Sequence, residues 1–541
     1  MDLSKGPFII GVLYHLLMAK QTSALDLALP SRDAKLPTYM WLYGALRTEI
    51  LQGHLRPGTR LPATRDLAAQ YGLSRGTVVT AFEQLKSEGY VQGTVGSGTF
   101  VSEVLPDDLL TIRKKVQAAE PQAENGKNGR RHLSKYATRA ERISGYEQRR
   151  FQPFRANVPA MDLFPIELWT QLTARRLRKL SRNLLLGCDA LGYPPLREAI
   201  ADYLNSSRGV MCKPEQVVIV SGMQEALDLA TRLFIDPGDK VGIENPGYVG
   251  AVAVFKAAGA KLVGLPVDEE GVTVDAKRLK GARMIYVTPA HQFPLGITIS
   301  LRRRLELLQW ARENRCMVFE DDYDSEYRYC GKPVPALQGV DCAGNVVFAG
   351  SFSKVMFPSL RLGYMVFPMD LVDRIAAVKS LASSHASLLQ QVVLCDFMTE
   401  GHYGRHIRRM REVYSSRQQV LVSESKKHLA GLLEVSPIEA GLQTVGWLQE
   451  GIIGITAAEA AAQRGVEVVP LSRYSSSGRY CIWSERDPAI REGLQLGFAA
   501  ISPAQIKSGV KELAIALETV LSKSGRSLHG EDAKAAVRAG V

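Results

Sequence analysis

Residues 346–364 read VVFAGSFSKVMFPSLRLGY and place a lysine, Lys354, a few residues after a short apolar run. Similar apolar runs recur between stretches with helical spacing. They cover residues 217–220, 240–243, 284–287, 317–319 and 346–349. Strands that alternate with helices are typical of a parallel sheet covered by helices. We therefore predict an α/β domain with a mostly parallel sheet over residues 151–521.

Length and composition limit the class of protein. A chain of 541 residues is too long for one hydrophobic core, and no apolar run is long enough to span a bilayer. The seven cysteines form no C-x-x-C pair, which argues against a disulfide framework or a zinc site and favours a reducing compartment. The net charge of +12 permits a polyanionic partner. We expect a cytoplasmic protein without a membrane partner.

The rest of the chain divides by texture. Residues 24–102 form a compact stretch with short helical patterns, and residues 103–150 lose periodicity and carry excess basic charge, as expected of a flexible linker. Residues 522–541 have the composition of a disordered tail. Residues 1–23 are interpreted as an N-terminal extension. The alternative is a signal peptide, but no small-residue cleavage site closes the apolar run at 8–18.

The stretch at 24–102 has the pattern of a winged helix-turn-helix. Residues 39–51 have helix spacing, with Leu42, Leu46, Ile50 and Leu51 on one face. Thr64 and Ser74 are expected to cap two further helices at 65–71 and 75–88, and the Gly-rich stretch 90–101 reads as a β-hairpin. In this plan the last helix enters the major groove of double-stranded DNA. The expected DNA contacts are Arg65, Ser74, Arg75, Gly76, Thr77, Gly96, Ser97 and Gly98.

Net charge alone does not decide this interpretation, since an ordinary three-helix unit with surface arginines would be similarly basic. The order of the residues is more specific than their charge. The stretch GHLRPGTRLPATRDLAAQYGLSRGTVVTAFEQLKSEGYVQGTVGSGTFV at 53–101 resembles the GntR-type DNA-binding domain over its full length. The resemblance implies a promoter as partner. Arginines of the linker are a further candidate contact to DNA phosphate, although a solvated linker is the favoured interpretation.

The string SFSK…PSLRLGY resembles the lysine segment of fold-type I aminotransferases, which carry pyridoxal phosphate (PLP). Lys354 is then the lysine that forms the Schiff base with PLP. The resemblance further implies that Asp321 pairs with the ring nitrogen, that Tyr323 hydrogen-bonds the ring hydroxyl and that Tyr248 stacks on the ring. The phosphate would be held by Gly222, Met223, Gln224, Ser351, Ser353 and Arg361. The carboxylates at 320–326 are alternatively a divalent metal site, although the glycine of an EF-hand is missing.

Residues 151–520 as a whole resemble the aminotransferase domain, and their fusion to a GntR-type module resembles the MocR subfamily of bacterial regulators. The strings TPAHQFPLG at 288–296 and EDDYDSEYRY at 320–329 are typical of that subfamily. The resemblance implies a homodimer with its DNA-binding modules exchanged between subunits. It also implies an amine or amino-acid effector, with vitamin B6 or amine metabolism genes as targets.

The chain departs from the aminotransferase pattern where a substrate would bind. Phe293 stands where N-P-x-G has asparagine, so His291 or Gln292 is expected to substitute. Gln495 stands in place of the arginine that binds a substrate carboxylate. Gly187 replaces a tyrosine lent by the partner subunit, and Gln443 replaces a frequent histidine. These changes favour a PLP-dependent sensor that regulates transcription. The alternative is an active aminotransferase with an attached DNA-binding module.

Overall fold

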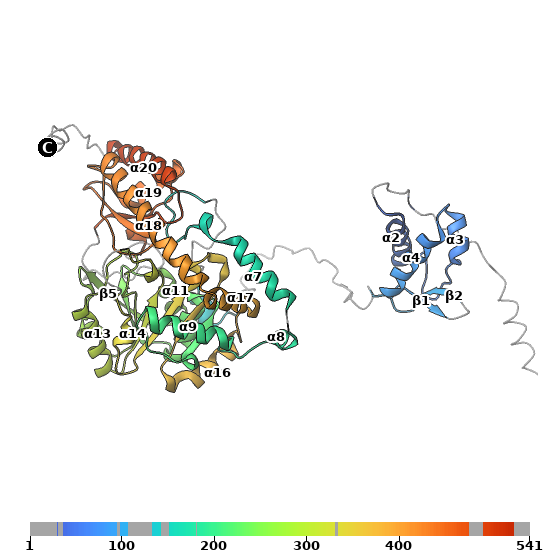
Figure 1. The fold of residues 1–541 in the computed structure, drawn as a ribbon, viewed down its shortest axis with the longest axis horizontal. Helices are drawn as coiled ribbons and strands as arrows, with labels where there is room; N and C mark the ends of the chain where they lie inside the picture. The colour runs from blue at the N-terminus through green and yellow to red at the C-terminus, as the bar shows by residue number, and fades with distance from the viewer. Residues whose placement is uncertain are drawn as a thin grey trace, which may run out of the picture. The chain divides into compact units, whose positions relative to one another are not determined.

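The computed structural model describes residues 30, 36–94, 98–106, 132–141, 151–179, 181–329, 334–474 and 491–523. The chain divides into two compact units, Met1–Arg130 and Arg131–Val541, here called the N-terminal and C-terminal units (Figure 1). The expectations for the extension at 1–23, for Gly96 and Ser97, and for the tail beyond 523 lie outside the described residues. Among the described helices, none is both long and apolar enough to cross a membrane.

The N-terminal unit consists of three helices and a hairpin, as the sequence pattern predicts. Its elements are α2 (Thr38–Leu51), α3 (Thr64–Gln70), α4 (Arg75–Ser87), β1 (Val91–Thr94) and β2 (Gly98–Val101). The two strands pair antiparallel, with Val91 opposite Val101. Leu42, Leu46 and Ile50 of α2 pack with the apolar face of α4, which confirms the predicted core of this unit.

Two details of this unit differ from the sequence expectations. Thr64 is the first residue of α3 rather than its cap, and the N-cap residue Ala63 has no side chain that can accept a hydrogen bond. Leu51 is exposed, because α2 ends there and the chain turns away through Gly53. The predicted cap of α4 is confirmed, since the Ser74 hydroxyl accepts a hydrogen bond from the Thr77 amide at 3.1 Å.

The C-terminal unit is built on a mixed eight-stranded sheet, here called the main sheet. Its strands are β3 (Val217–Val220), β4 (Lys240–Asn245), β5 (Lys261–Asp268), β6 (Gly271–Val272), β7 (Ala282–Val287), β8 (Met317–Asp322), β9 (Val346–Ser351) and β10 (Gly363–Val366). They lie in the order β3-β10-β9-β8-β7-β4-β5-β6. The five strands from β9 to β5 are parallel, and β10 runs antiparallel between β3 and β9.

Helices cover both faces of the main sheet, which confirms the predicted α/β architecture (Figure 1). The described helices of the C-terminal unit up to residue 428 are α6 (Lys135–Arg139), α7 (Ile166–Arg178), α8 (Arg182–Leu186), α9 (Pro194–Ser207), α10 (Met223–Phe234), α11 (Val249–Ala258), α12 (Ala276–Leu279), α13 (Leu301–Glu313), α14 (Leu337–Val340), α15 (Phe352–Val355), α16 (Val372–Ala382), α17 (Leu388–Thr399) and α18 (His402–His428). Alternate residues of β3 belong to two different cores: Val217 and Ile219 to one, Val218 and Val220 to the other. Each strand of this kind must be apolar on both faces, hence the continuous apolar runs in the sequence.

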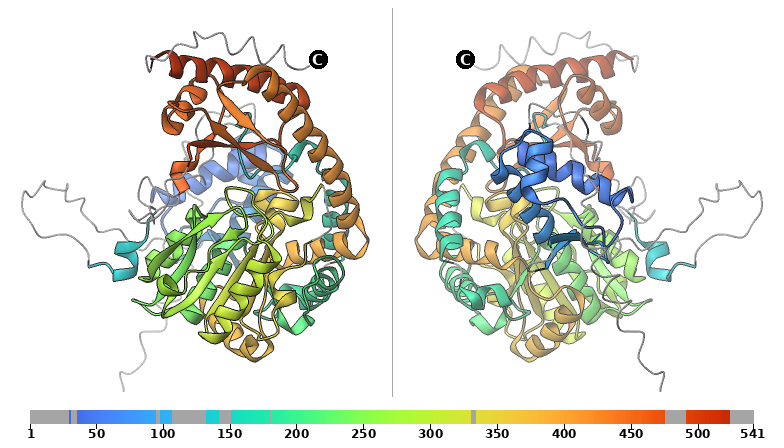
Figure 2. Two further views of the ribbon diagram at one scale, coloured as in Figure 1. Left: turned by 90° about the vertical axis from the view of Figure 1, so that its left-hand side faces the viewer. Right: turned by 90° about the vertical axis from the view of Figure 1, so that its right-hand side faces the viewer.

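A second, antiparallel sheet follows, which the sequence patterns do not separate from the first. Its strands β11 (Leu433–Val435), β12 (Gln443–Leu448), β14 (Gly493–Gly497) and β13 (Val469–Pro470) lie in that order. Helices α18, α19 (Gly454–Gln463) and α20 (Pro503–Lys523) pack with this small sheet (Figure 2). The segment predicted as a linker also contains structure, because α6 packs against α11 and Arg139 Nε donates to the Ala257 carbonyl at 3.0 Å.

Gly192 tests the packing between the main sheet and the turn before α9. Its φ is +109°, and a Cβ there would lie 2.4 Å from Ile219 Cγ1. We expect Gly192→Ala to lower the free energy of unfolding by about 2–4 kcal/mol, because both the backbone and the core are strained. Gly238→Ala is the matched control, since its φ is +101° but nothing lies within 4 Å of the added Cβ. Thermal unfolding of the two variants measures the difference; equal midpoints would contradict the packing argument.

Candidate functional site

The polar residues predicted for one site do converge at the carboxyl ends of the main-sheet strands. Because β10 is inserted between β3 and β9, its residue Gly363 pairs with Val220 on one side and with Ser351 on the other. The turn after β3 and the turn after β9 therefore lie on either side of one strand. Strand ends of this kind are where open α/β sheets bind ligands.

Lys354 lies in the short helix α15, directly after β9. Its Nζ donates a hydrogen bond to the Asn157 carbonyl at 2.9 Å. Burial lowers the pKa of this amine to about 8, against the opposing effect of the carboxylates Asp324 and Asp321. A lysine in this state is partly neutral near physiological pH, so its nitrogen is available as a nucleophile.

Asp321 is the last but one residue of β8 and is almost completely buried. The Tyr286 hydroxyl donates to its Oδ2 at 2.6 Å, whereas Oδ1 has no hydrogen-bond partner among the described residues. Burial raises the pKa of this carboxyl to about 7, although the Tyr286 hydrogen bond acts in the opposite direction. A buried acceptor without a partner is costly, so this oxygen is prepared for a donor that a ligand brings.

Tyr323, His291 and Asp324 form a buried group next to Asp321. His291 Nδ1 lies 2.9 Å from Asp324 Oδ1 and 3.0 Å from the Tyr323 hydroxyl, and His291 Nε2 has no partner in the described part of the chain. Gln292, the other expected substitute for asparagine, donates instead to the Pro246 and Phe293 carbonyls. Of the two expected substitutes for asparagine, His291 is therefore the one whose side chain has a nitrogen available to a ligand.

The turn after β3 has the geometry of an anion cradle. Gly222 has φ +111° and precedes α10, whose first amides have no capping side chain. A Cβ on Gly222 would lie 3.7 Å from the guanidinium carbon of Arg361, so that charge lies beside the helix start. From the other turn, Ser351 Oγ accepts from the Ser353 amide at 3.3 Å, and Ser353 Oγ is buried without a partner among the described residues.

Two further predicted residues, Gln224 and Tyr248, are held together at this site. Gln224 Nε2 donates to the Tyr248 hydroxyl at 3.0 Å. The Tyr248 ring meets Phe293 edge to face at 5.8 Å. Met223 begins α10 and contributes its backbone amide to the helix start. The structure thus brings together all ten residues expected around Lys354.

The four carboxylates at 320–324 do not converge as a metal site would require. Glu320 accepts hydrogen bonds from the Leu337 and Gln338 amides, and Asp322 accepts from Arg208 at 2.6 Å. Asp321 and Asp324 bind Tyr286 and His291, as described above. Each of the four side chains therefore has its own, different hydrogen-bond partners.

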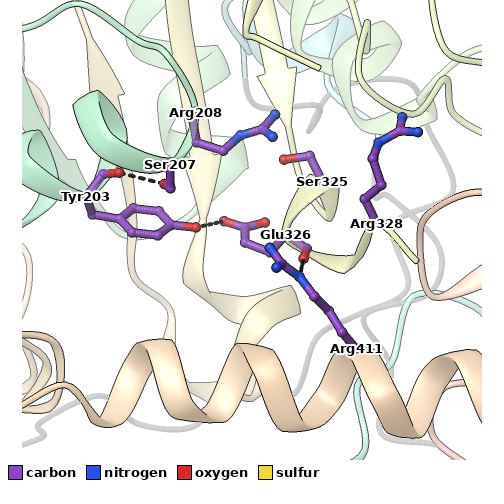
Figure 3. A pocket seen from close by; sticks show the side chains of 7 residues that line it. All are labelled: Tyr203, Ser207, Arg208, Ser325, Glu326, Arg328 and Arg411. Atoms are coloured by element: carbon purple, nitrogen blue, oxygen red, sulfur yellow. Dashed lines mark hydrogen bonds between the residues drawn. The ribbon is translucent and has the colours of Figure 1, made fainter. Parts of the chain in front are cut away.

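A separate polar cavity of about 140 Å³ lies between the end of α9, the segment after β8 and α18 (Figure 3). The Tyr203 hydroxyl donates to Glu326 Oε1 at 3.3 Å, and burial raises the pKa of Glu326 to about 7. Figure 3 shows the Arg411 side chain rising from α18 toward Glu326, and its Nε donates to the Glu326 carbonyl. These contacts, with Arg208 on Asp322, fix β8 from the face opposite Asp321.

The sequence interpretation missed three residues of the site. Asn157 lies 197 positions from Lys354, so no local pattern indicates their contact. Tyr286 is hidden in an apolar strand, where a polar aromatic is the only signal. Asp324 was noted only as part of an acidic run. The predicted departures are also placed: Gln443 and Gln495 are buried on β12 and β14, and Gly187, with φ +101°, lies against His385.

In the N-terminal unit, Arg75 and Gly76 form the exposed first turn of α4, next to Ser74 and Thr77. Arg65 is exposed on α3. The structure adds Arg60, because a Cβ on Gly98 would lie 2.9 Å from its Nε. A basic side chain thus lies beside the hairpin. The sequence pattern of the turn before α3, which contains Arg60, did not predict this position.

Comparison with known proteins identifies both units. The family model for aminotransferase class I and II matches residues 154–485, and that for bacterial regulatory proteins of the gntR family matches residues 38–101. The probable rhizopine catabolism regulatory protein MocR of Rhizobium meliloti is 39% identical over 498 residues, which cover 91% of this chain and 96% of that protein. The HTH-type transcriptional regulator TauR of Rhodobacter capsulatus is 31% identical, over 86% of this chain and 94% of that one.

Solved structures of aminotransferases share the fold of the C-terminal unit. The α-aminoadipate aminotransferase LysN of Thermus thermophilus, complexed with N-(5'-phosphopyridoxyl)-L-leucine, has a TM-score of 0.64 at 27% identity, over 72% of this chain and 98% of that one. The kynurenine aminotransferase of Pyrococcus horikoshii, in complex with PMP, has a TM-score of 0.62 at 27% identity, over 68% and 91%. The chain belongs to the MocR-type regulators, in which a GntR-family helix-turn-helix unit is joined to an aminotransferase class I and II domain.

Proposed function

We propose that this regulator uses its aminotransferase-like domain as a PLP-dependent sensor for an amine, and that the loaded sensor changes how the N-terminal unit binds promoter DNA. The observation that carries the proposal is that Lys354 and Asp321 are buried close enough for the charge of Asp321 to raise the pKa of Lys354. A lysine with a lowered pKa lies near a buried carboxylate that has one oxygen without a partner among the described residues. These are the two groups that PLP requires at opposite ends of its ring.

The remaining residues fit the rest of the cofactor. Asp321 would keep a proton on the ring nitrogen, Tyr323 and His291 would face the ring hydroxyl, and Tyr248 would lie against the ring. The phosphate would be held by the start of α10, at Gly222, Met223 and Gln224, and by Ser351, Ser353 and Arg361. Bound PLP supplies an aldehyde carbon that takes amines reversibly and a ring that accepts electrons.

The N-terminal unit would read DNA through the start of α4. Arg75, Gly76 and Thr77 occupy its first turn, and Gly98, with Arg60 beside it, begins β2 at the turn end of the hairpin. Helices of this type place their N-terminal residues against base edges in the major groove. An effector shifts the DNA-binding state only if it binds the two arrangements of the protein with different affinity. Such a regulator acts in the cytoplasm, where its promoter lies.

We further propose that the protein is a homodimer. Leu185, Leu186 and Leu381 are all at least 70% exposed, and the contact of Gly187 with His385 places them in one region. Apolar side chains that cluster on a surface mark an interface. The segment at 103–150 then connects the DNA-binding domain at 24–102 to the aminotransferase-like domain at 151–521. Through this connection the DNA-binding domains are exchanged between the two subunits.

Loading with PLP tests the assignment of Lys354. We expect the purified protein to gain a visible absorption band with PLP, and Lys354→Ala to abolish it, because the Lys354 amine is the group that attaches the cofactor in this proposal. Lys277→Ala, on the exposed surface of α12, is the matched control and should keep the band. A wild-type protein that stays colourless with PLP would overturn the cofactor assignment.

Turnover separates the sensor from the alternative, an active aminotransferase. Gln443 and Gln495 are neutral, so neither side chain supplies a bound amino acid with a cation that aligns its carboxylate. We expect mixtures of an amino acid and a keto acid to leave product at no more than the stoichiometric level of bound PLP. Sustained product formation, measured by amino-acid analysis, would favour the enzyme.

Arg75 tests the DNA-binding surface. We expect Arg75→Ala to weaken binding to the cognate operator by about 1–3 kcal/mol if the guanidinium reads a base edge. Arg312→Ala removes an equal charge from the exposed surface of α13 and should leave binding unchanged. Fluorescence anisotropy at fixed salt measures both variants. Equal affinity of Arg75→Ala and wild type would exclude this role.

A further inference from the structure

Two buried carboxamides, Gln443 and Gln495, face the same side of the small sheet. Gln495 is paired with Val445 across β14 and β12, and Gln443 lies two residues before Val445. Side chains two apart on a strand share a face, so the two glutamines are diagonal neighbours, roughly 7–8 Å apart. Both are at most 2% exposed, and the Nε2 atom of each has no partner among the described residues.

The oxygen end of each carboxamide is already committed. Gln443 Oε1 accepts from the Asn157 amide at 2.8 Å, and Gln495 Oε1 accepts from the Tyr474 hydroxyl at 2.7 Å. A backbone amide can only donate, so the contact with Asn157 fixes which end of Gln443 is the nitrogen. Gln443 therefore has a neutral N–H donor left to offer, and Gln495 offers one as well when its oxygen accepts from Tyr474.

Both donors belong to the wall of the Lys354 site. Asn157 connects Gln443 to Lys354, because its amide binds the glutamine and its carbonyl accepts from the lysine. Tyr474 connects Gln495 to the aromatic side of the site. Its ring meets Phe293 edge to face at 5.1 Å, and Phe293 meets Tyr323 in the same way at 6.0 Å. Val445, between the two glutamines, packs in the same cluster as Tyr248 and Tyr323.

The charge of this wall determines what it can bind. Within the described residues, neither carboxamide is hydrogen-bonded to a lysine or an arginine; the nearby Arg155 pairs with Glu467 at 3.2 Å, and Arg361 lies beside Gly222. Among the described residues, the two carboxamides would therefore offer a buried carboxylate neutral N–H donors and no positive charge of their own. A hydroxyl or carbonyl oxygen needs only an N–H donor, and within the described part of the chain the Nε2 atoms of both glutamines have no other partner.

We propose that the effector is a primary amine that carries hydroxyl or carbonyl oxygens and no carboxylate, and that Gln443 and Gln495 recognise those oxygens. This inference rests on the proposed function, since PLP on Lys354 supplies the site where the amine is taken. The two glutamines are thus specificity-determining residues for an amino alcohol or an amino polyol rather than for an amino acid.

Matched pairs of small amines test the inference on the full-length, PLP-loaded protein. 3-Amino-1-propanol and β-alanine have the same chain length and differ in a hydroxymethyl against a carboxylate group, and serinol and serine form a second pair. The change in cofactor absorbance gives a dissociation constant for each. We expect the amino alcohols to bind at least tenfold more tightly. Equal or tighter binding of the amino acids, or no response to either class, would overturn the inference while leaving PLP binding intact.

Variants at Gln495 give the complementary test. Gln495→Arg should reverse the preference within each pair, because it adds a cation with two parallel donors. Gln309→Arg, an equal charge change on the exposed face of α13, should not. Where Gln495→Arg fails to fold, Gln495→Met serves instead and should weaken amino-alcohol binding without improving that of amino acids. An unchanged preference in the substituted protein would contradict the role of Gln495. A protein without the PLP band would refute the proposed function, and this inference with it.

Discussion

The alternation of side chains along β8 is the constraint on which the site depends. Asp321 points to one face of the main sheet, toward Tyr286, and Asp322 to the other, toward Arg208. Burying ionisable groups in the middle of a domain is costly unless each has a partner. Asp322 has its arginine, and the neighbouring Glu320 accepts two backbone amides. Asp321 and Asp322 each have one oxygen without a partner in the described chain, but Asp322 is paired with an arginine, whereas Asp321 accepts only from the neutral Tyr286 hydroxyl. The carboxyl hydrogen-bonded only by a neutral group is therefore the one at the position where a ligand is expected.

The segment after β8 connects the region of Asp321 to the small sheet. The Gly441 amide donates to the Tyr327 carbonyl at 3.0 Å, and Asp324 Oδ2 accepts from the Leu442 amide at 3.3 Å. A Cβ on Gly441 would lie 2.1 Å from His291, so only glycine lets the two segments approach. Gln443 begins β12 directly after this contact.

The sequence predicted the parts of this arrangement that have a local signature. The apolar runs located five strands of the main sheet to within three residues at their ends, because a strand buried on both faces must be continuously apolar. The cap at Ser74 followed from one side chain and one amide. The cap at Thr64 was wrong, because the helix begins at that residue and leaves its hydroxyl inside the first turn.

What the sequence did not predict depends on contacts between distant segments. Lys354 meets Asn157, and Gln443 meets the same residue from the other side, across 197 and 286 positions. The small sheet was missed because β11 and β13 are three and two residues long, too short to show a period of two. The glutamine at position 495 was visible in the sequence. Its hydrogen bond with Tyr474, which occupies the oxygen and leaves the nitrogen as a donor, could be seen only in the fold.

The two ends of the site differ in a way that suits a sensor. The cofactor end holds charged or ionisable groups, Lys354, Asp321 and Arg361. The effector end holds neutral amides, whose hydrogen bonds to a neutral ligand are individually modest. A ligand bound by such contacts leaves again when its concentration falls. Strong retention of the cofactor and reversible capture of the effector are what a regulator requires, whereas a transaminase gains from a fixed carboxylate that aligns each substrate for reaction.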